Sequence, residues 1–121
     1  MNNKFDITRV TNAVKEHRFV EALSLIEGNL ASNPEHKDSL YLAAVCSRYL
    51  KNFDDSKKYI ESLLTHAPDM GRAYQELGHL SKAMGDDEKA IVYYRQACEL
   101  NPALVASWDF LYRYFVKVKN E

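Results

Sequence analysis

Histidine and cysteine are the residues of this chain that could ligate a metal ion or act in catalysis. They are His17, His36, His66, His79, Cys46 and Cys98. None of them has a second histidine or cysteine at the close spacing of a zinc site. The two cysteines lie in different helical patterns, and we interpret them as small buried apolar residues in a reducing compartment. A reactive thiol is the weaker alternative, because neither cysteine has a basic cluster or a helix N-terminus beside it.

Two acidic runs, Asp54–Asp55 and Asp86–Glu88, could ligate a cation. Each stands where a helix is expected to begin, and acidic side chains there are stabilised by the helix dipole. The chain has only four glycines, too few for a phosphate-binding loop, and no nucleotide-binding or nucleophile-elbow motif. We therefore expect no metal site, no cofactor and no enzymatic activity.

The composition is that of a globular protein without a strong charge bias. The 121 residues include 16 Lys and Arg against 17 Asp and Glu, giving a formal net charge of −1, and 46% are hydrophobic. The near balance argues against a general nucleic-acid binder, which usually has a basic domain. The sequence has neither a membrane-spanning apolar run nor the apolar core of a secretory signal. We expect a single cytoplasmic domain over residues 1–121 with no membrane partner.

The prolines reveal an internal repeat. The only three are Pro34, Pro68 and Pro102, so 34 residues separate each from the next. This register gives repeats 3–36, 37–70 and 71–104, followed by a partial unit. Small residues recur in one column of the register, at Ala22, Ser56 and Ala90.

Each repeat has the pattern of two helices joined by a tight turn. In the third repeat, Gly85 supplies a left-handed position after the first helix, and Asp86 or Asp87 caps the second. Asn101 stands before Pro102 and ends that helix, because a residue before proline is driven out of helical geometry. We expect an all-α fold with helices near residues 4–16, 19–32, 37–50, 53–66, 71–84, 87–100 and 104–118.

In these respects the chain resembles a tetratricopeptide repeat (TPR) protein, whose period is 34 residues. The signature residues of that family are matched in the third and partial fourth repeats by Tyr74, Leu77, Gly78, Ala90, Pro102, Trp108 and Leu111. The resemblance covers nearly the whole chain and is specific for the fold rather than the function. It implies an α-α superhelix (TPR solenoid) of three helix-turn-helix repeats plus a C-terminal helix, with a concave groove.

The resemblance also implies which side chains line that groove, since the first helix of each repeat faces it in this family. The binding residues selected in this way are Tyr41, Arg48, Tyr49, Arg72, Gln75, His79, Lys82, Asp109 and Arg113. Over all groove columns, from Lys4 to Lys117, seven basic residues face two acidic ones, which polarises an otherwise balanced chain. We interpret the groove as a basic trough with aromatic anchors for an acidic or carboxylate-bearing peptide. Ordinary solvated charges are the alternative, and nucleic acid is a lesser one, because the acidic outer surface would repel phosphate.

One well-known TPR groove binds the C-terminal EEVD of heat-shock chaperones through basic and Asn side chains. The matching positions here are Ile7, Thr11, Arg72 and Glu76, and only Arg72 keeps the required charge. We therefore do not expect a chaperone cofactor of that type.

The last expected helix is apolar on two flanks. We expect the flank of Trp108, Leu111, Tyr112 and Phe115 to pack on the third repeat. The second flank consists of Phe110, Tyr114 and Val118. We interpret it as an exposed association surface for a weak homodimer, or as the seat of a further helix of a longer protein. Ordinary surface side chains are the alternative.

The leading hypothesis for the function is a non-catalytic scaffold or adaptor that holds a peptide or partner segment in its groove. A second hypothesis, also from the resemblance, is an N-terminal accessory domain of a larger enzyme such as a sulfotransferase or glycosyltransferase. A third is a self-associating structural element.

Overall fold

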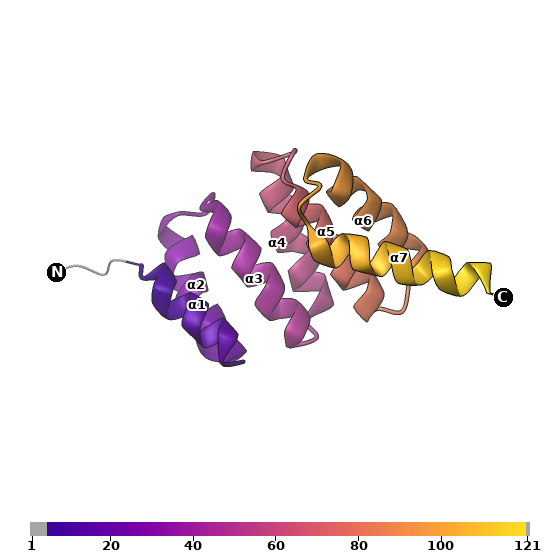
Figure 1. The fold of residues 1–121 in the computed structure, drawn as a ribbon. Helices are drawn as coiled ribbons and strands as arrows, with labels where there is room; N and C mark the ends of the chain where they lie inside the picture. The colour runs from indigo at the N-terminus through magenta and orange to yellow at the C-terminus, as the bar shows by residue number, and fades with distance from the viewer. Residues whose placement is uncertain (1–4, 121) are drawn as a thin grey trace. The chain divides into compact units, whose positions relative to one another are not determined.

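The computed structural model describes residues 5–120, which form seven helices and no strand (Figure 1). The helices are α1 (Ile7–Lys15), α2 (Phe19–Ser32), α3 (Lys37–Tyr49), α4 (Phe53–His66), α5 (Gly71–Ala83), α6 (Asp87–Leu100) and α7 (Val105–Lys119). The predicted all-α class is confirmed. The predicted start of the first repeat at residue 3, and Lys4 of the predicted groove, lie outside the described residues.

The helix bounds agree closely with those predicted, and α2, α4 and α6 have the predicted first and last residues. The largest difference is at α1, which begins at Ile7 rather than near residue 4. Its N-cap is Asp6, whose carboxylate accepts hydrogen bonds from the backbone N–H groups of Thr8 (3.0 Å) and Arg9 (3.3 Å). An aspartate in this role fixes where a helix begins, and the periodicity of apolar residues did not identify it.

The turn inside each repeat has the same backbone conformation, not only the same spacing. His17, Lys51 and Gly85 have φ angles of 61°, 64° and 80°, so all three are left-handed. The N–H after each of them donates to a carbonyl five residues back: Arg18 to Ala13 (2.8 Å), Asn52 to Ser47 (2.8 Å) and Asp86 to Ser81 (2.9 Å). This bond is typical of the Schellman helix end. The sequence predicted the left-handed conformation only at Gly85.

The chain forms two compact units, the first ending at His66 and the second beginning at Ala67. In the first unit α1 packs on α2, α2 on α3 and α3 on α4. Its core includes Val10, Ala13, Ala22, Ile26, Ala43 and Cys46. The predicted single domain over residues 1–121 stays a prediction.

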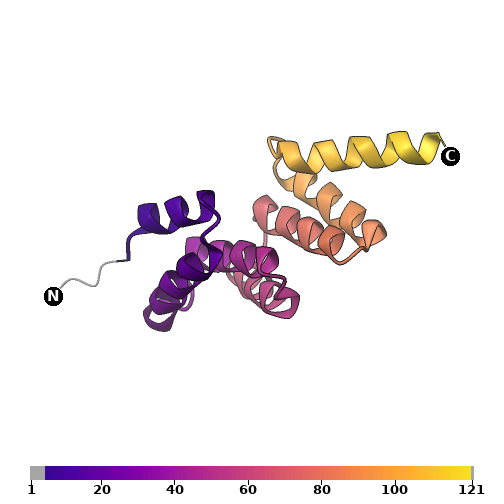
Figure 2. The same cartoon turned by 90° about the horizontal axis from the view of Figure 1, so that it is seen from below.

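In the second unit α6 packs on both α5 and α7 (Figure 2). Its core cluster is made of Ala90, Tyr94, Cys98 and Leu111. Cys46 of the first unit and Cys98 of the second are both free and buried, which confirms their predicted burial.

Small residues let the two helices of a repeat approach closely. In the first unit, the Ser56 hydroxyl of α4 donates to the backbone carbonyl of Ala44 in α3 at 2.8 Å. In the second unit, a Cβ at Gly78 of α5 would lie 2.6 Å from the ring of Tyr94 in α6. Ala90, in the small-residue column of the repeat, is fully buried.

Candidate functional site

In the first unit, the selected binding residues lie on α3. Tyr49 stacks on Phe19 of α2, with ring centroids 4.5 Å apart and planes 5° apart. His17 stacks on Phe19 at 5.3 Å, and the guanidinium carbon of Arg48 lies 4.6 Å from the centroid of the Tyr49 ring. Tyr49 is nevertheless 51% exposed. The α3 aromatic cluster (His17, Phe19 and Tyr49) therefore holds a ring and a neighbouring cation in place at the surface, whereas Tyr41 is half-buried.

Sequence reasoning selected Tyr49 and Arg48 but missed the side chains that support them. Neither Phe19 nor His17 is among the residues that the repeat pattern selects. His17 is exposed, but its ring stacks on Phe19. Because α2 packs on α3, the turn that precedes α2 lies beside the C-terminal end of α3. The signal in the sequence was that His17 and Phe19 stand at the start of one expected helix and Tyr49 at the end of the next.

In the second unit, two of the selected residues on α5 make contacts within the fold. Oε1 of Gln75 accepts hydrogen bonds from the N–H (3.1 Å) and the hydroxyl (2.7 Å) of Ser107 on α7. Nδ1 of His79 and the hydroxyl of Tyr94 on α6 share a hydrogen bond of 2.6 Å. Gln75 and His79 are half-buried, so part of the hydrogen-bonding capacity of each side chain serves to position the helices.

The other selected residues of this unit, Arg72, Lys82, Asp109 and Arg113, are exposed. Nε of Arg113 lies 3.1 Å from a carboxylate oxygen of Asp109, and both side chains are more than half exposed. Such a pair stabilises by less than about 1 kcal/mol, but it offsets the positive charge locally. Nζ of Lys82 lies 5.6 Å from the ring centroid of Phe110. Within the selected residues, Asp109 therefore offsets the charge of Arg113.

The predicted exposed ridge on α7 is wrong for two of its three members. The ring of Phe110 packs against Tyr94 with centroids 4.6 Å apart, and Tyr114 stacks on Phe110 at 6.4 Å. Phe110 and Tyr114 are half-buried, and only Val118, at 48%, is well exposed. Self-association of the chain stays a prediction, but these three side chains do not form one exposed surface.

The physical reason is the direction that α7 faces, to which a buried polar residue in its first turns contributes. Ser107 is fully buried and hydrogen-bonded to Gln75. Its face continues through Phe110, Leu111 and Tyr114, at the spacing of one helical stripe. Of the flank predicted to pack, Leu111 is buried, whereas the aromatic members are exposed: Trp108 (50%), Tyr112 (70%) and Phe115 (44%).

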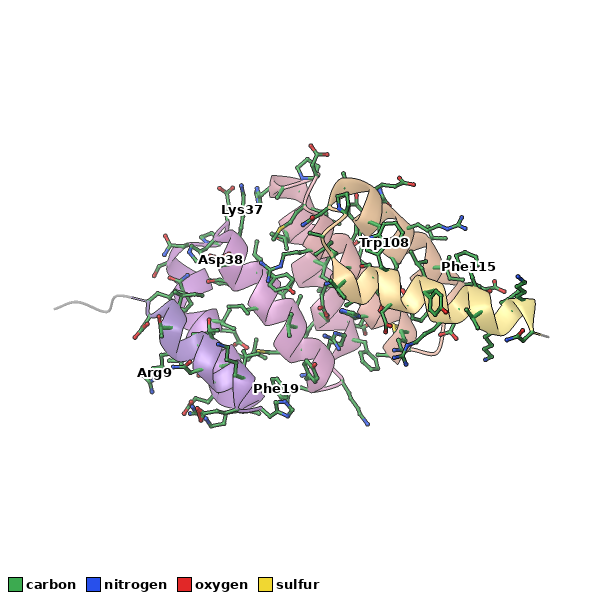
Figure 3. The ribbon with its side chains drawn as sticks, viewed as in Figure 1. Arg9, Phe19, Lys37, Asp38, Trp108 and Phe115 are labelled. Atoms are coloured by element: carbon green, nitrogen blue, oxygen red, sulfur yellow. The ribbon has the colours of Figure 1, made fainter. Side chains whose placement is uncertain are left out.

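A groove of about 550 Å³ lies between α6 and α7. It is lined by Arg95, Cys98, Glu99, Trp108, Leu111, Tyr112 and Phe115, of which Trp108 and Phe115 are labelled on α7 in Figure 3. Burial raises the pKa of the Cys98 thiol above its ordinary value. Because the thiolate is the reactive form, Cys98 is a poor nucleophile at neutral pH, which weighs against the reactive-thiol alternative for this cysteine.

No metal-binding cluster of three or more His, Cys, Asp or Glu side chains occurs among residues 5–120. Over the same described range, none of the helices combines the length and the apolar character required to cross a membrane.

Two models of the tetratricopeptide repeat match the chain, one at residues 38–69 and the other at 71–104. Together they cover more than half of the chain, and they coincide closely with the second and third repeats set by the prolines. No curated protein matches the chain by sequence.

Similar solved structures are TPR proteins. The first TPR of Spaghetti (RPAP3), bound to the HSP90 peptide SRMEEVD, is 18% identical with a TM-score of 0.79, over 94% of this chain and 90% of that one. The Sgt2 TPR domain from Aspergillus fumigatus is 18% identical with a TM-score of 0.80, over 93% and 76%. MamA 41-end from Desulfovibrio magneticus RS-1 is 20% identical with a TM-score of 0.75, over 91% of this chain and 62% of that one. At these identities the likeness shows the fold, an all-α TPR solenoid.

Proposed function

Because this chain belongs to the tetratricopeptide repeat family, we propose that it is a protein-interaction scaffold that binds an acidic or carboxylate-bearing peptide. The proposed contacts come from α3, α5 and α7. They are Tyr41, Arg48, Tyr49, Arg72, Gln75, His79, Lys82, Asp109 and Arg113.

The observation that carries this proposal is the α3 aromatic cluster with Arg48 beside it. Tyr49 is held by its stacking on Phe19, yet half of its surface is exposed. A ring that is already ordered loses little conformational freedom when a ligand packs on it. Arg48 adds a guanidinium group, which binds carboxylates through paired, charge-assisted hydrogen bonds.

The charge of the second unit supports an acidic ligand. Arg72 and Lys82 are exposed basic side chains on α5, and Arg113 is exposed on α7. Peptide binding by a similar fold also supports the proposal, because the RPAP3 TPR structure contains the peptide SRMEEVD. We propose a different acidic sequence for this chain, since Ile7 and Thr11 stand where the chaperone-binding groove has a basic residue and an amide.

The test is a binding measurement with a fluorescein-labelled peptide of about ten residues that contains several Glu residues and a free C-terminal carboxylate. Fluorescence anisotropy would measure its affinity at about 20 mM and about 150 mM salt, and we expect weaker binding at the higher salt. Reversing two charges, in the variant Arg48→Glu/Arg72→Glu, should weaken binding by about tenfold or more, because charge-assisted hydrogen bonds are lost.

The matched control is Lys57→Glu/Lys58→Glu, which reverses two exposed charges on α4, the second helix of a repeat. It changes the net charge equally but leaves the proposed contacts intact. Circular dichroism should show the same helical content for both variants and the wild type. Equal losses of affinity in the two variants, or an affinity independent of salt, would contradict the proposed site.

A further inference from the structure

The face of α7 that contains Tyr112 corresponds, by its position in the repeat, to a face that is covered in the second and third repeats. Tyr112 stands one period of 34 residues after Gly78, which stands one period after Ala44. The ring of Tyr94 from α6 covers Gly78, and Ser56 from α4 contacts Ala44. Tyr112, in contrast, is 70% exposed. Within residues 5–120, no helix covers this face of α7 in the way that α4 covers α3 and α6 covers α5.

The exposed face is aromatic and forms one wall of the groove between α6 and α7. Trp108, Tyr112 and Phe115 line it, with Cys98 and Leu111 among its apolar lining. Contiguous exposed apolar surface of this kind marks an interaction site in soluble proteins. A groove of about 550 Å³ is large enough to accept side chains from a partner.

The shape of this face differs from that of the two covered faces. Ala44 and Gly78 allow the second helix of their repeat to approach closely, whereas the same column holds a tyrosine ring in α7. A helix packed on α7 would therefore lie farther away than α4 lies from α3. The face is better suited to interdigitating aromatic side chains than to a further helix of the same repeat type.

The charges beside the groove differ between its two ends. The guanidinium carbon of Arg95 lies 5.1 Å from the ring centroid of Phe115, which places Arg95 at one end. The indole N–H of Trp108 donates to the backbone carbonyl of Pro102 at 2.8 Å, which places Trp108 at the opposite end, beyond the last turn of α6. Glu99 lies in that last turn. The groove thus has a basic end at Arg95 and an acidic end at Glu99.

We propose that a second copy of this chain occupies the groove, with the two α7 helices antiparallel about a two-fold axis. A two-fold axis across the groove places the basic end of one copy beside the acidic end of the other, so each contact occurs twice. Trp108, Tyr112 and Phe115 of the two copies then pack against one another.

The size of the face indicates a weak dimer. Three aromatic side chains, which are 44% to 70% exposed, contribute roughly 300 Å² per copy. A standard stable interface buries roughly 800 Å² per partner. We therefore expect association that increases with protein concentration rather than a permanent dimer.

Sedimentation velocity of the full chain from about 10 μM to about 1 mM tests the proposal, because this range brackets a weak association. The wild type should shift from monomer towards dimer as its concentration rises. Tyr112→Lys should remain monomeric throughout, because it places a charge in the centre of the apolar contact. The control Val105→Lys adds the same charge at a side chain that is 77% exposed on the same helix but does not line the groove. It should dimerise like the wild type.

Charge reversal tests the two-fold arrangement. Arg95→Glu and Glu99→Arg should each weaken the dimer several-fold, and the double variant should recover most of the loss because opposite charges again face each other. A wild-type monomer at all concentrations, a dimer that persists in Tyr112→Lys, or a double variant weaker than both single variants would overturn the proposal. Tyr112 is not one of the proposed contacts for the acidic peptide. The result of the peptide-binding measurement is therefore independent of the result of the dimerisation experiment.

Discussion

Gly78 and Gly28 both lie inside helices, but only at Gly78 do neighbouring side chains leave no room for a larger residue. A Cβ at Gly78 would lie 2.6 Å from the Tyr94 ring, and Tyr94 is itself packed on Phe110 and hydrogen-bonded to His79. The ring therefore has little freedom to move away. At Gly28 in α2, an added Cβ would meet nothing within 4 Å.

The same substitution should have opposite effects at these two glycines. Gly78→Ala should lower the free energy of unfolding by about 1–3 kcal/mol through overpacking. Gly28→Ala should raise it by about 0.5–1 kcal/mol, because alanine favours the helix interior. Urea titrations followed by circular dichroism would measure both. A stable Gly78→Ala variant would show that the Tyr94 ring adjusts more easily than its contacts suggest.

Residue-level prediction from the sequence succeeded where the repeat specified a residue type. The column of small residues, Ala22, Ser56 and Ala90, is fully buried in the structure, and the prolines set its register. It failed at Phe110 and Tyr114, because their burial depends on which direction α7 faces. Ser107 contributes to that orientation by bonding to Gln75, a contact between residues 32 positions apart that no local pattern encodes.

The three turns inside the repeats are equivalent elements built from different residues. Gly85 adopts its left-handed conformation without a steric penalty, whereas His17 and Lys51 adopt it at a cost. The stacking of His17 on Phe19 offsets part of that cost. Lys51 is exposed, so its side chain can be replaced to stabilise this turn without disturbing the core.

Lys51→Gly should stabilise the protein by about 0.5–1 kcal/mol, because glycine is the favoured residue at this position of a helix end. The matched control is Lys58→Gly, the same change at an exposed position inside α4. It should destabilise by about 1 kcal/mol. Thermal unfolding followed by circular dichroism would compare the two variants. A lower midpoint for Lys51→Gly would mean that the lysine makes a stabilising contact that outweighs its backbone strain.

At the scale of the whole molecule, stability depends on pH through groups whose pKa differs between the folded and unfolded chain. Tyr59 of α4 packs against the core of the first unit. Burial, and then the nearby carboxylates of Glu27 and Asp55, raise the pKa of its hydroxyl above the ordinary value near 10. The folded chain therefore holds this proton more tightly than the unfolded chain does.

The contribution of Tyr59 should be fully present below about pH 10 and be lost as the pH rises through and above that value. Tyr59→Phe removes the ionisable group and should lose less stability between pH 9 and 11 than the wild type. Urea midpoints measured across this range provide the comparison, and parallel curves for the wild type and Tyr59→Phe would refute the assignment.

The order in which the helices pack has a consequence for the speed of folding. Within each unit, each helix packs on the next helix along the chain, and α7 also contacts α5, which skips a single helix. Only short loops must close before apolar surface is buried, so the entropy lost before the first stabilising contacts form is small. Helical domains with such low contact order fold in microseconds to milliseconds. Each unit of this chain is thus expected to reach its native contacts quickly, with its apolar surfaces exposed only briefly.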